Sequence, residues 1–153
     1  MLSAGAVLAC ALSLVGRSQS HMPTIELLEV VPAHVSPRAE AFTQHDTQTI
    51  YLITSSDVFR EALAAPGCRH TDALRKLASI LVHEEWHIRN GMDERGAYYS
   101  QLTALQSLGL GPDSNVYHGV LKSMQHVLGE QERPRERTVL ARKRRAARDR
   151  RSG

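Results

Sequence analysis

The sequence has little cysteine, few aromatic residues and none of the short motifs that identify the commonest enzyme classes. It contains two cysteines, Cys10 and Cys68, and aromatic residues make up 5% of its 153 residues. It has no phosphate-binding loop, no glycine-rich dinucleotide fingerprint and no serine- or cysteine-nucleophile motif. These absences argue against nucleotide-dependent enzymes and nucleophilic hydrolases. Two cysteines are also too few for a scaffold built on several disulfides.

The N-terminal segment has no charge over residues 4–16 and is too short to span a bilayer comfortably. It resembles the apolar region of a signal peptide, with residues 18–20 as a cleavage site, although residues 1–3 lack Lys and Arg. We expect residues 1–20 to be a signal peptide or an N-terminal anchor. The protein is then exported or periplasmic, with a cytoplasmic location as the alternative. Cleavage would remove Cys10, so we expect Cys68 to be an unpaired residue of a turn-like loop.

The C-terminal segment concentrates the positive charge of the chain. Residues 131–153 contain ten Arg or Lys and three Asp or Glu, so this tail carries +7 and the remaining residues carry −4 of the overall +3. Repelling charges with few large apolar residues favour a disordered extension. We expect that its removal leaves metal binding intact. An anionic membrane surface or an acidic protein is the partner expected for the tail of an exported protein, whereas nucleic acid fits only a cytoplasmic one.

Residues 22–130 have the pattern of a single α+β domain. Residues 25–31 and 49–54 are rich in β-branched and apolar side chains and predict strands. Helices are predicted at about residues 56–64, 72–90, 94–108 and 114–128, from apolar periodicity, caps and the glycines between them. The chain is long enough for one modest hydrophobic core.

The predicted helix over residues 72–90 ends in the motif His83-Glu84-Glu85-Trp86-His87. Histidines four residues apart lie on one face of a helix, so both imidazoles can reach one metal ion. On a helical wheel Glu84 falls inside the apolar stripe, where a carboxylate is costly unless something compensates it. Glu85 falls outside the stripe and is expected to be solvated. This pattern, HExxH, predicts a zinc site with Glu84 as the general base.

This segment resembles the active-site helix of the zincin metallopeptidases, and more narrowly that of short, gluzincin-like bacterial ones. The resemblance covers about residues 77–105, and the family usually has an apolar residue where Glu85 stands. It implies a small zincin-like domain, with a few strands packed on the active-site helix and further helices after it. It also implies that a glutamate in an ExxA setting, here Glu94 with Ala97, is the third metal ligand. Asp93 is the alternative ligand, but it is well placed to cap the next helix.

The resemblance also implies that an edge strand holds an extended peptide beside the metal, and residues 49–54 are the candidate; a core strand is the alternative. Tyr98 could donate a hydrogen bond to an oxyanion or simply pack, and Tyr99 is a weaker candidate. His118 and His126 are expected to be solvated, or to support the metal ligands, rather than to bind the metal.

Three functions fit these patterns. The first is a zinc-dependent peptide-bond hydrolase acting on a peptide or protein. The second is a non-catalytic zinc-binding regulatory domain that retains the zincin core. The third is an interaction protein that acts through its basic tail. The sequence leaves the natural substrate and the oligomeric state open.

Overall fold

The computed structural model describes residues 1–130, so the predictions for the basic tail lie outside the described residues. A three-stranded sheet forms one layer of the fold. It consists of β1 (Thr24–Leu28), β2 (Ala41–Gln44) and β3 (Thr49–Ile53) in the order β1-β3-β2. β3 pairs with β1 in parallel and with β2 antiparallel. The α+β class predicted from the sequence is therefore confirmed.

The strand at residues 49–54 is the central strand and not the edge strand. Because β1 and β2 occupy both of its edges, its backbone cannot receive a peptide. The edge strand beside the helix that carries the HExxH motif is instead β2, which was not predicted from the sequence. β2 is only four residues long and contains one large apolar side chain, Phe42, so its sequence gives little strand signal.

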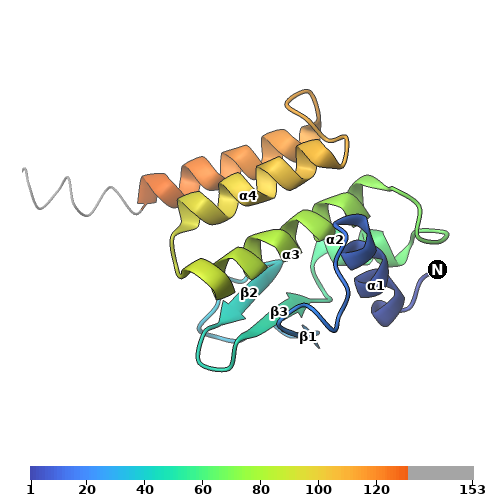
Figure 1. Cartoon of the computed structure of the whole chain (residues 1–153), viewed down its shortest axis with the longest axis horizontal. Helices are drawn as coiled ribbons and strands as arrows, with labels where there is room; N and C mark the ends of the chain where they lie inside the picture. Colours follow the sequence, from blue (N-terminus) through green and yellow to red (C-terminus); the bar gives the residue numbers. More distant parts are fainter. Residues whose placement is uncertain (131–153) are drawn as a thin grey trace, which may run out of the picture.

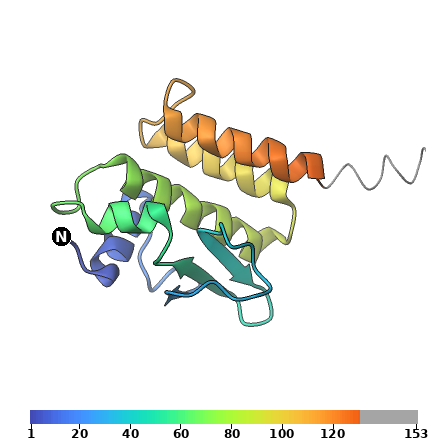
Figure 2. The ribbon, with the colours of Figure 1, turned by 180° about the vertical axis from the view of Figure 1, so that it is seen from behind.

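The helices follow the sequence predictions closely. They are α2 (Asp57–Leu63), α3 (Asp72–Asn90), α4 (Glu94–Ser107) and a helix over residues 115–130. The Thr71 hydroxyl caps α3 by accepting from the N–H of Leu74. At the other end Gly91 has a φ of 93°, which glycine adopts without strain. The sheet lies on one side of α3, and α4 and the helix over residues 115–130 lie on the other (Figures 1 and 2).

The first helix, α1 (Ala4–Leu14), is packed into the domain. Five of its residues are at most 3% exposed and belong to the main core: Val7, Leu8, Cys10, Ala11 and Leu12. Cys10 forms a disulfide with Cys68, in the loop between α2 and α3. The expectation that Cys68 is an unpaired loop residue is thus wrong, because α1 packs beside that loop. None of the helices in residues 1–130 is both long and apolar enough to cross a bilayer.

Two apolar clusters hold the described residues together. The larger one lies between α1, α2, α3 and the sheet, and it includes Ile50, Phe59, Leu77 and Leu81, none of which is exposed. The smaller one joins α4 to the helix over residues 115–130. α3 thus has one side against the main core and another against α4.

Candidate metal centre

His83 and His87 lie one turn apart on α3, with 8% and 3% of their surface exposed. The Nδ1 atom of His83 lies 3.0 Å from Oε1 of Gln101, and Nδ1 of His87 lies 2.8 Å from the carbonyl oxygen of Gly91. Both partners are acceptors, so in its neutral form each ring carries its proton on Nδ1 and leaves the Nε2 lone pair free. A hydrogen bond of this kind fixes the tautomer of a metal-binding histidine.

Gln101 is itself held in place by a buried chain of hydrogen bonds. Its Nε2 donates to the hydroxyl of Ser79 at 3.3 Å, and that hydroxyl donates to the carbonyl of Lys76 at 2.6 Å. Since Gln101 and Ser79 are 5% and 0% exposed, this chain keeps the His83 ring oriented without solvent. No signal in the sequence predicted the contact of Gln101 with His83, because it depends on the packing of α4 on α3.

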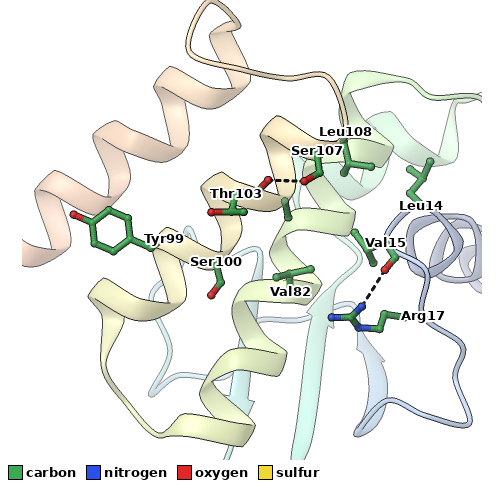
Figure 3. A pocket seen from close by; sticks show the side chains of 10 residues that line it. Leu14, Val15, Arg17, Val82, Tyr99, Ser100, Thr103, Ser107 and Leu108 are labelled. Atoms are coloured by element: carbon green, nitrogen blue, oxygen red, sulfur yellow. Dashed lines mark hydrogen bonds between the residues drawn. The ribbon is translucent and has the colours of Figure 1, made fainter.

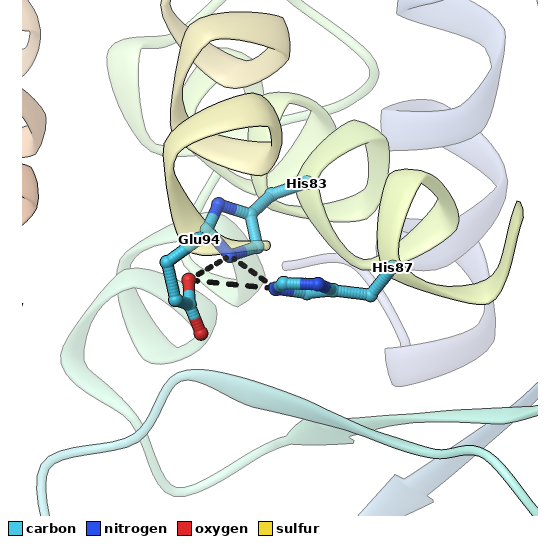
Figure 4. Close-up of side chains that lie close together, drawn as sticks. All are labelled: His83, His87 and Glu94. Atoms are coloured by element: carbon cyan, nitrogen blue, oxygen red, sulfur yellow. Dashed lines mark hydrogen bonds and ion pairs between the residues drawn. The ribbon is translucent and has the colours of Figure 1, made fainter. Parts of the chain in front are cut away.

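Glu94 is the first residue of α4 and reaches both imidazoles. Its Oε2 lies 3.3 Å from Nε2 of His83 and 3.4 Å from Nε2 of His87 (Figure 4). Asp93 is instead the N-cap of α4, with its carboxylate accepting from the N–H of Arg95 at 3.1 Å. The structure therefore brings Glu94 to the two histidines and gives Asp93 the capping role that the sequence predicted for it.

The three ligand atoms fit a tetrahedral ion. The two Nε2 atoms lie 3.2 Å apart, and their separations from the Glu94 oxygen are 3.3 and 3.4 Å. Metal–ligand bonds of about 2.0–2.1 Å in a tetrahedron place ligand atoms about 3.3–3.4 Å apart. Two imidazole lone pairs and a carboxylate that point at one another also repel unless a cation or a proton lies between them. His83, His87 and Glu94 could thus hold a metal ion, and the nitrogen and oxygen donors suit zinc.

The electrostatics of these side chains favour a bound cation. Hydrogen bonds with His83 and with His87 lower the pKa of Glu94 to about 2, against the opposing effect of burial. Burial lowers the pKa of His87, but its hydrogen bonds with Glu94 and Gly91 and the charges of Glu94 and Glu84 outweigh it and raise that pKa. Without a metal, His87 therefore binds a proton more readily than an ordinary histidine does.

The cleft beside these ligands has a volume of about 440 Å³ and also contains Glu84 and Tyr98. Glu84 is 7% exposed, and its Oε2 accepts a 2.6 Å hydrogen bond from the hydroxyl of Thr43 on β2. The Tyr98 ring packs edge-on against His83, with 4.6 Å between centroids. Burial, together with the charges of Glu94, Glu84 and Glu40, raises the pKa of Tyr98 to about 12, so its hydroxyl keeps its proton at neutral pH.

Glu85 is buried, in contrast to the sequence prediction. Only 6% of its surface is exposed, because two arginines enclose its carboxylate. The Nε atom of Arg17 lies 3.1 Å from Oε2, and that of Arg89 lies 2.9 Å from Oε1. The helical wheel missed this pairing because Arg17 follows α1 and is 68 residues away in sequence. Glu85 therefore fixes α3 to the N-terminal segment on the side away from the cleft.

α4 approaches α3 closely at Gly96. A Cβ atom at this position would overlap the indole ring of Trp86. Ala97, the next residue of α4, is fully buried. These two small residues allow the first turn of α4, with Glu94, to lie next to the histidines.

The remaining candidate residues lie away from the metal ligands. Tyr99 is 54% exposed and lines a different hollow, between the end of α1 and α4, whose lining includes Val15, Arg17 and Thr103 (Figure 3). His118 is exposed, and His126 is exposed and pairs with Glu130 at 3.2 Å. Both histidines are solvated as predicted.

Comparison with protein-family profiles, curated proteins and solved structures finds no match. The geometry of the site therefore carries the functional argument.

Proposed function

We propose that the protein is a zinc-dependent hydrolase of peptide bonds. The observation that carries this proposal is the convergence of His83, His87 and Glu94 on one point, beside the buried carboxylate of Glu84. A bound zinc ion would supply Lewis acidity, which polarises a scissile carbonyl and acidifies water. Glu84 would accept the proton of the attacking water and then deliver it to the leaving amine. Tyr98, which keeps its proton at neutral pH, is the candidate donor to the developing oxyanion.

The position of β2 supports a peptide as the substrate. β2 is an edge strand, and Ala41 at its start lines the same cleft as His83 and Glu84. An edge strand offers backbone N–H and C=O groups, which can bind an extended peptide irrespective of its sequence. β2 thus replaces residues 49–54 as the strand proposed to bind substrate.

Zinc binding is tested first, with two adjacent acidic residues as a matched pair. We expect protein purified without added zinc to contain one zinc ion per chain by mass spectrometry. Glu94→Gln should weaken zinc affinity by well over tenfold, because it removes a ligand. Asp93→Asn should keep the affinity and cost about 1 kcal/mol of stability at the cap. The reverse order would make Asp93 the ligand.

Catalysis is tested with Glu84→Gln, using a mixture of unstructured peptides and mass spectrometry of the fragments. Loss of a general base should lower the cleavage rate by about 10²–10⁴-fold while zinc is retained. Glu61→Gln, an exposed position on α2, is the control and should cleave normally. A zinc-loaded protein that cleaves no peptide would point instead to the non-catalytic regulatory domain.

We also propose that the protein is exported, because disulfides persist in oxidising compartments and the Cys10–Cys68 disulfide is compatible with one. In this proposal residues 4–14 stay in the folded protein, since their removal would expose the main core. The mass of the mature N-terminus, measured in the native host, tests it. A protein that begins after residue 20 would contradict the retention of α1.

A further inference from the structure

Thr43 connects the edge strand to Glu84. Side chains alternate along β2, so that Phe42 stacks on Tyr51 at 4.9 Å whereas Thr43 faces α3. The Thr43 hydroxyl lies 2.6 Å from Oε2 of Glu84 and 3.4 Å from the backbone carbonyl of the same residue. A hydroxyl has one proton to donate, and the short distance assigns it to the carboxylate.

This hydrogen bond is the direct anchor of the Glu84 carboxylate within residues 1–130. The ion-pair contacts of the residues closest to Glu84 go to other groups: His83 and His87 contact Glu94, and Glu85 contacts two arginines. A glutamate side chain has several rotatable bonds, so a carboxylate that must accept a proton at one place needs a fixed partner. Thr43 fixes Oε2 and leaves Oε1 available as the base.

We infer that Thr43 is a positioning residue for the general base, an inference that rests on the proposed function. Thr43 belongs to the strand that is proposed to bind the peptide backbone. The position of the peptide and the position of the base are therefore set by the same short element. A shift of β2 would displace both together and so preserve their relation to each other.

The test compares Thr43→Val, which keeps the shape and removes the hydroxyl, with Thr43→Ser, which keeps the hydroxyl. We expect Thr43→Val to lower kcat by about 10–100-fold with KM and zinc content little changed, since small misplacements of catalytic groups have effects of this size. Thr43→Ser should restore most of kcat. The control is Thr49→Val on β3, because the Thr49 hydroxyl bonds to the carbonyl of Thr47 and not to Glu84.

Crystal structures of the variants provide a readout that does not depend on turnover. The Glu84 carboxylate should leave its position in Thr43→Val and keep it in Thr43→Ser. If the carboxylate does not move in Thr43→Val, the role of Thr43 is overturned but the proposed function is not. The same holds if kcat is unchanged in Thr43→Val while Glu84→Gln is inactive. Equal losses in Thr43→Val and Thr49→Val would also overturn it, since they would show a general effect on the sheet. A wild-type protein that binds zinc and cleaves no peptide would overturn the proposed function and this role together.

Discussion

Glu84 and Glu85 are neighbours on α3 and are almost equally buried, at 7% and 6% exposure, but their surroundings are opposite. Glu85 lies on the side of α1 and binds the guanidinium groups of Arg17 and Arg89. Glu84 lies in the cleft, where its direct partner is the neutral hydroxyl of Thr43. One helix therefore carries two buried carboxylates, one paired with two arginines and the other with a single neutral partner in the cleft.

The difference shows what burial requires of a charged side chain. Two permanent cations balance the charge of Glu85, and they leave it no capacity for chemistry. Glu84 has one neutral donor, so its burial is costly unless the charges in the cleft compensate it. A metal ion at His83, His87 and Glu94 would provide that compensation. The cost of burying Glu84 is thus a physical reason to expect a cation nearby.

The largest expected effect comes from removing the disulfide that ties α1 to the loop before α3. The double variant Cys10→Ala, Cys68→Ala removes a crosslink with a sequence separation of 58. The chain-entropy model gives about 4 kcal/mol for a loop of that size, and we expect a loss approaching this value in urea unfolding. Zinc affinity of the folded variant should be unchanged, because α1 contributes no metal ligand. A parallel loss of zinc would show that the two sides of α3 are coupled.

A second test removes the positive charges that surround the Glu85 carboxylate. The double variant Arg17→Gln, Arg89→Gln leaves a buried carboxylate without a cation, which should cost about 3 kcal/mol in urea unfolding. We take the low end for broken buried pairs, since the arginine side chains are 41% and 59% exposed.

The matched variant is Glu85→Leu, which removes the carboxylate and leaves two arginines that water can solvate. It should change stability by no more than about 1 kcal/mol and keep peptide cleavage. If Glu85→Leu is inactive although it is folded and zinc-loaded, the assignment of a purely structural role to Glu85 is wrong.

The smallest expected effect is a pH dependence on the cleft side. In zinc-free protein the raised pKa of His87 contributes stability that is complete below about pH 6.5 and is lost as pH rises through that pKa. The lowered pKa of Glu94 contributes stability that is present above pH 4.5 and is lost as the pH falls towards 2. Zinc binds the neutral imidazole, so the gain in Tm on adding zinc to EDTA-treated protein should be larger at pH 8 than at pH 6.

Glu94→Gln provides the control for this pH dependence, because it removes the carboxylate that raises the pKa of His87. The Tm of its zinc-free form should vary less between pH 6 and pH 8 than that of the wild type. Asp93→Asn should behave as the wild type does.

The parts of the fold that were predicted correctly depend on local sequence. The bounds of α3 follow from the cap at Thr71 and the glycine at position 91, and the approach of His83 to His87 follows from helical periodicity. The capping role of Asp93, which favours Glu94 as the third ligand, is also local.

The parts that were missed depend on contacts between distant segments. The Thr43 hydroxyl is 41 residues from Glu84, Arg17 is 68 residues from Glu85, and the Cys10–Cys68 disulfide has no local signal. Of these contacts, only that of Glu85 with Arg89, four residues later on α3, is local. The apolar run of residues 4–16 resembles a signal peptide, and its local sequence does not show that it packs as α1 against the main core.

Gly96 has a consequence for how this site tolerates mutation. A glycine inside a helix lowers its stability by roughly 0.5–1 kcal/mol relative to alanine, so a search for stabilising changes would select Gly96→Ala early. Here the added methyl group has no room against Trp86. The substitution that helix propensity recommends therefore requires either the Trp86 ring or α4 to move. If α4 moves, we expect Glu94, in its first turn, to move relative to the histidines. Position 96 can thus affect the site although it contributes no ligand atom, and a general rule for improving helices fails at this residue.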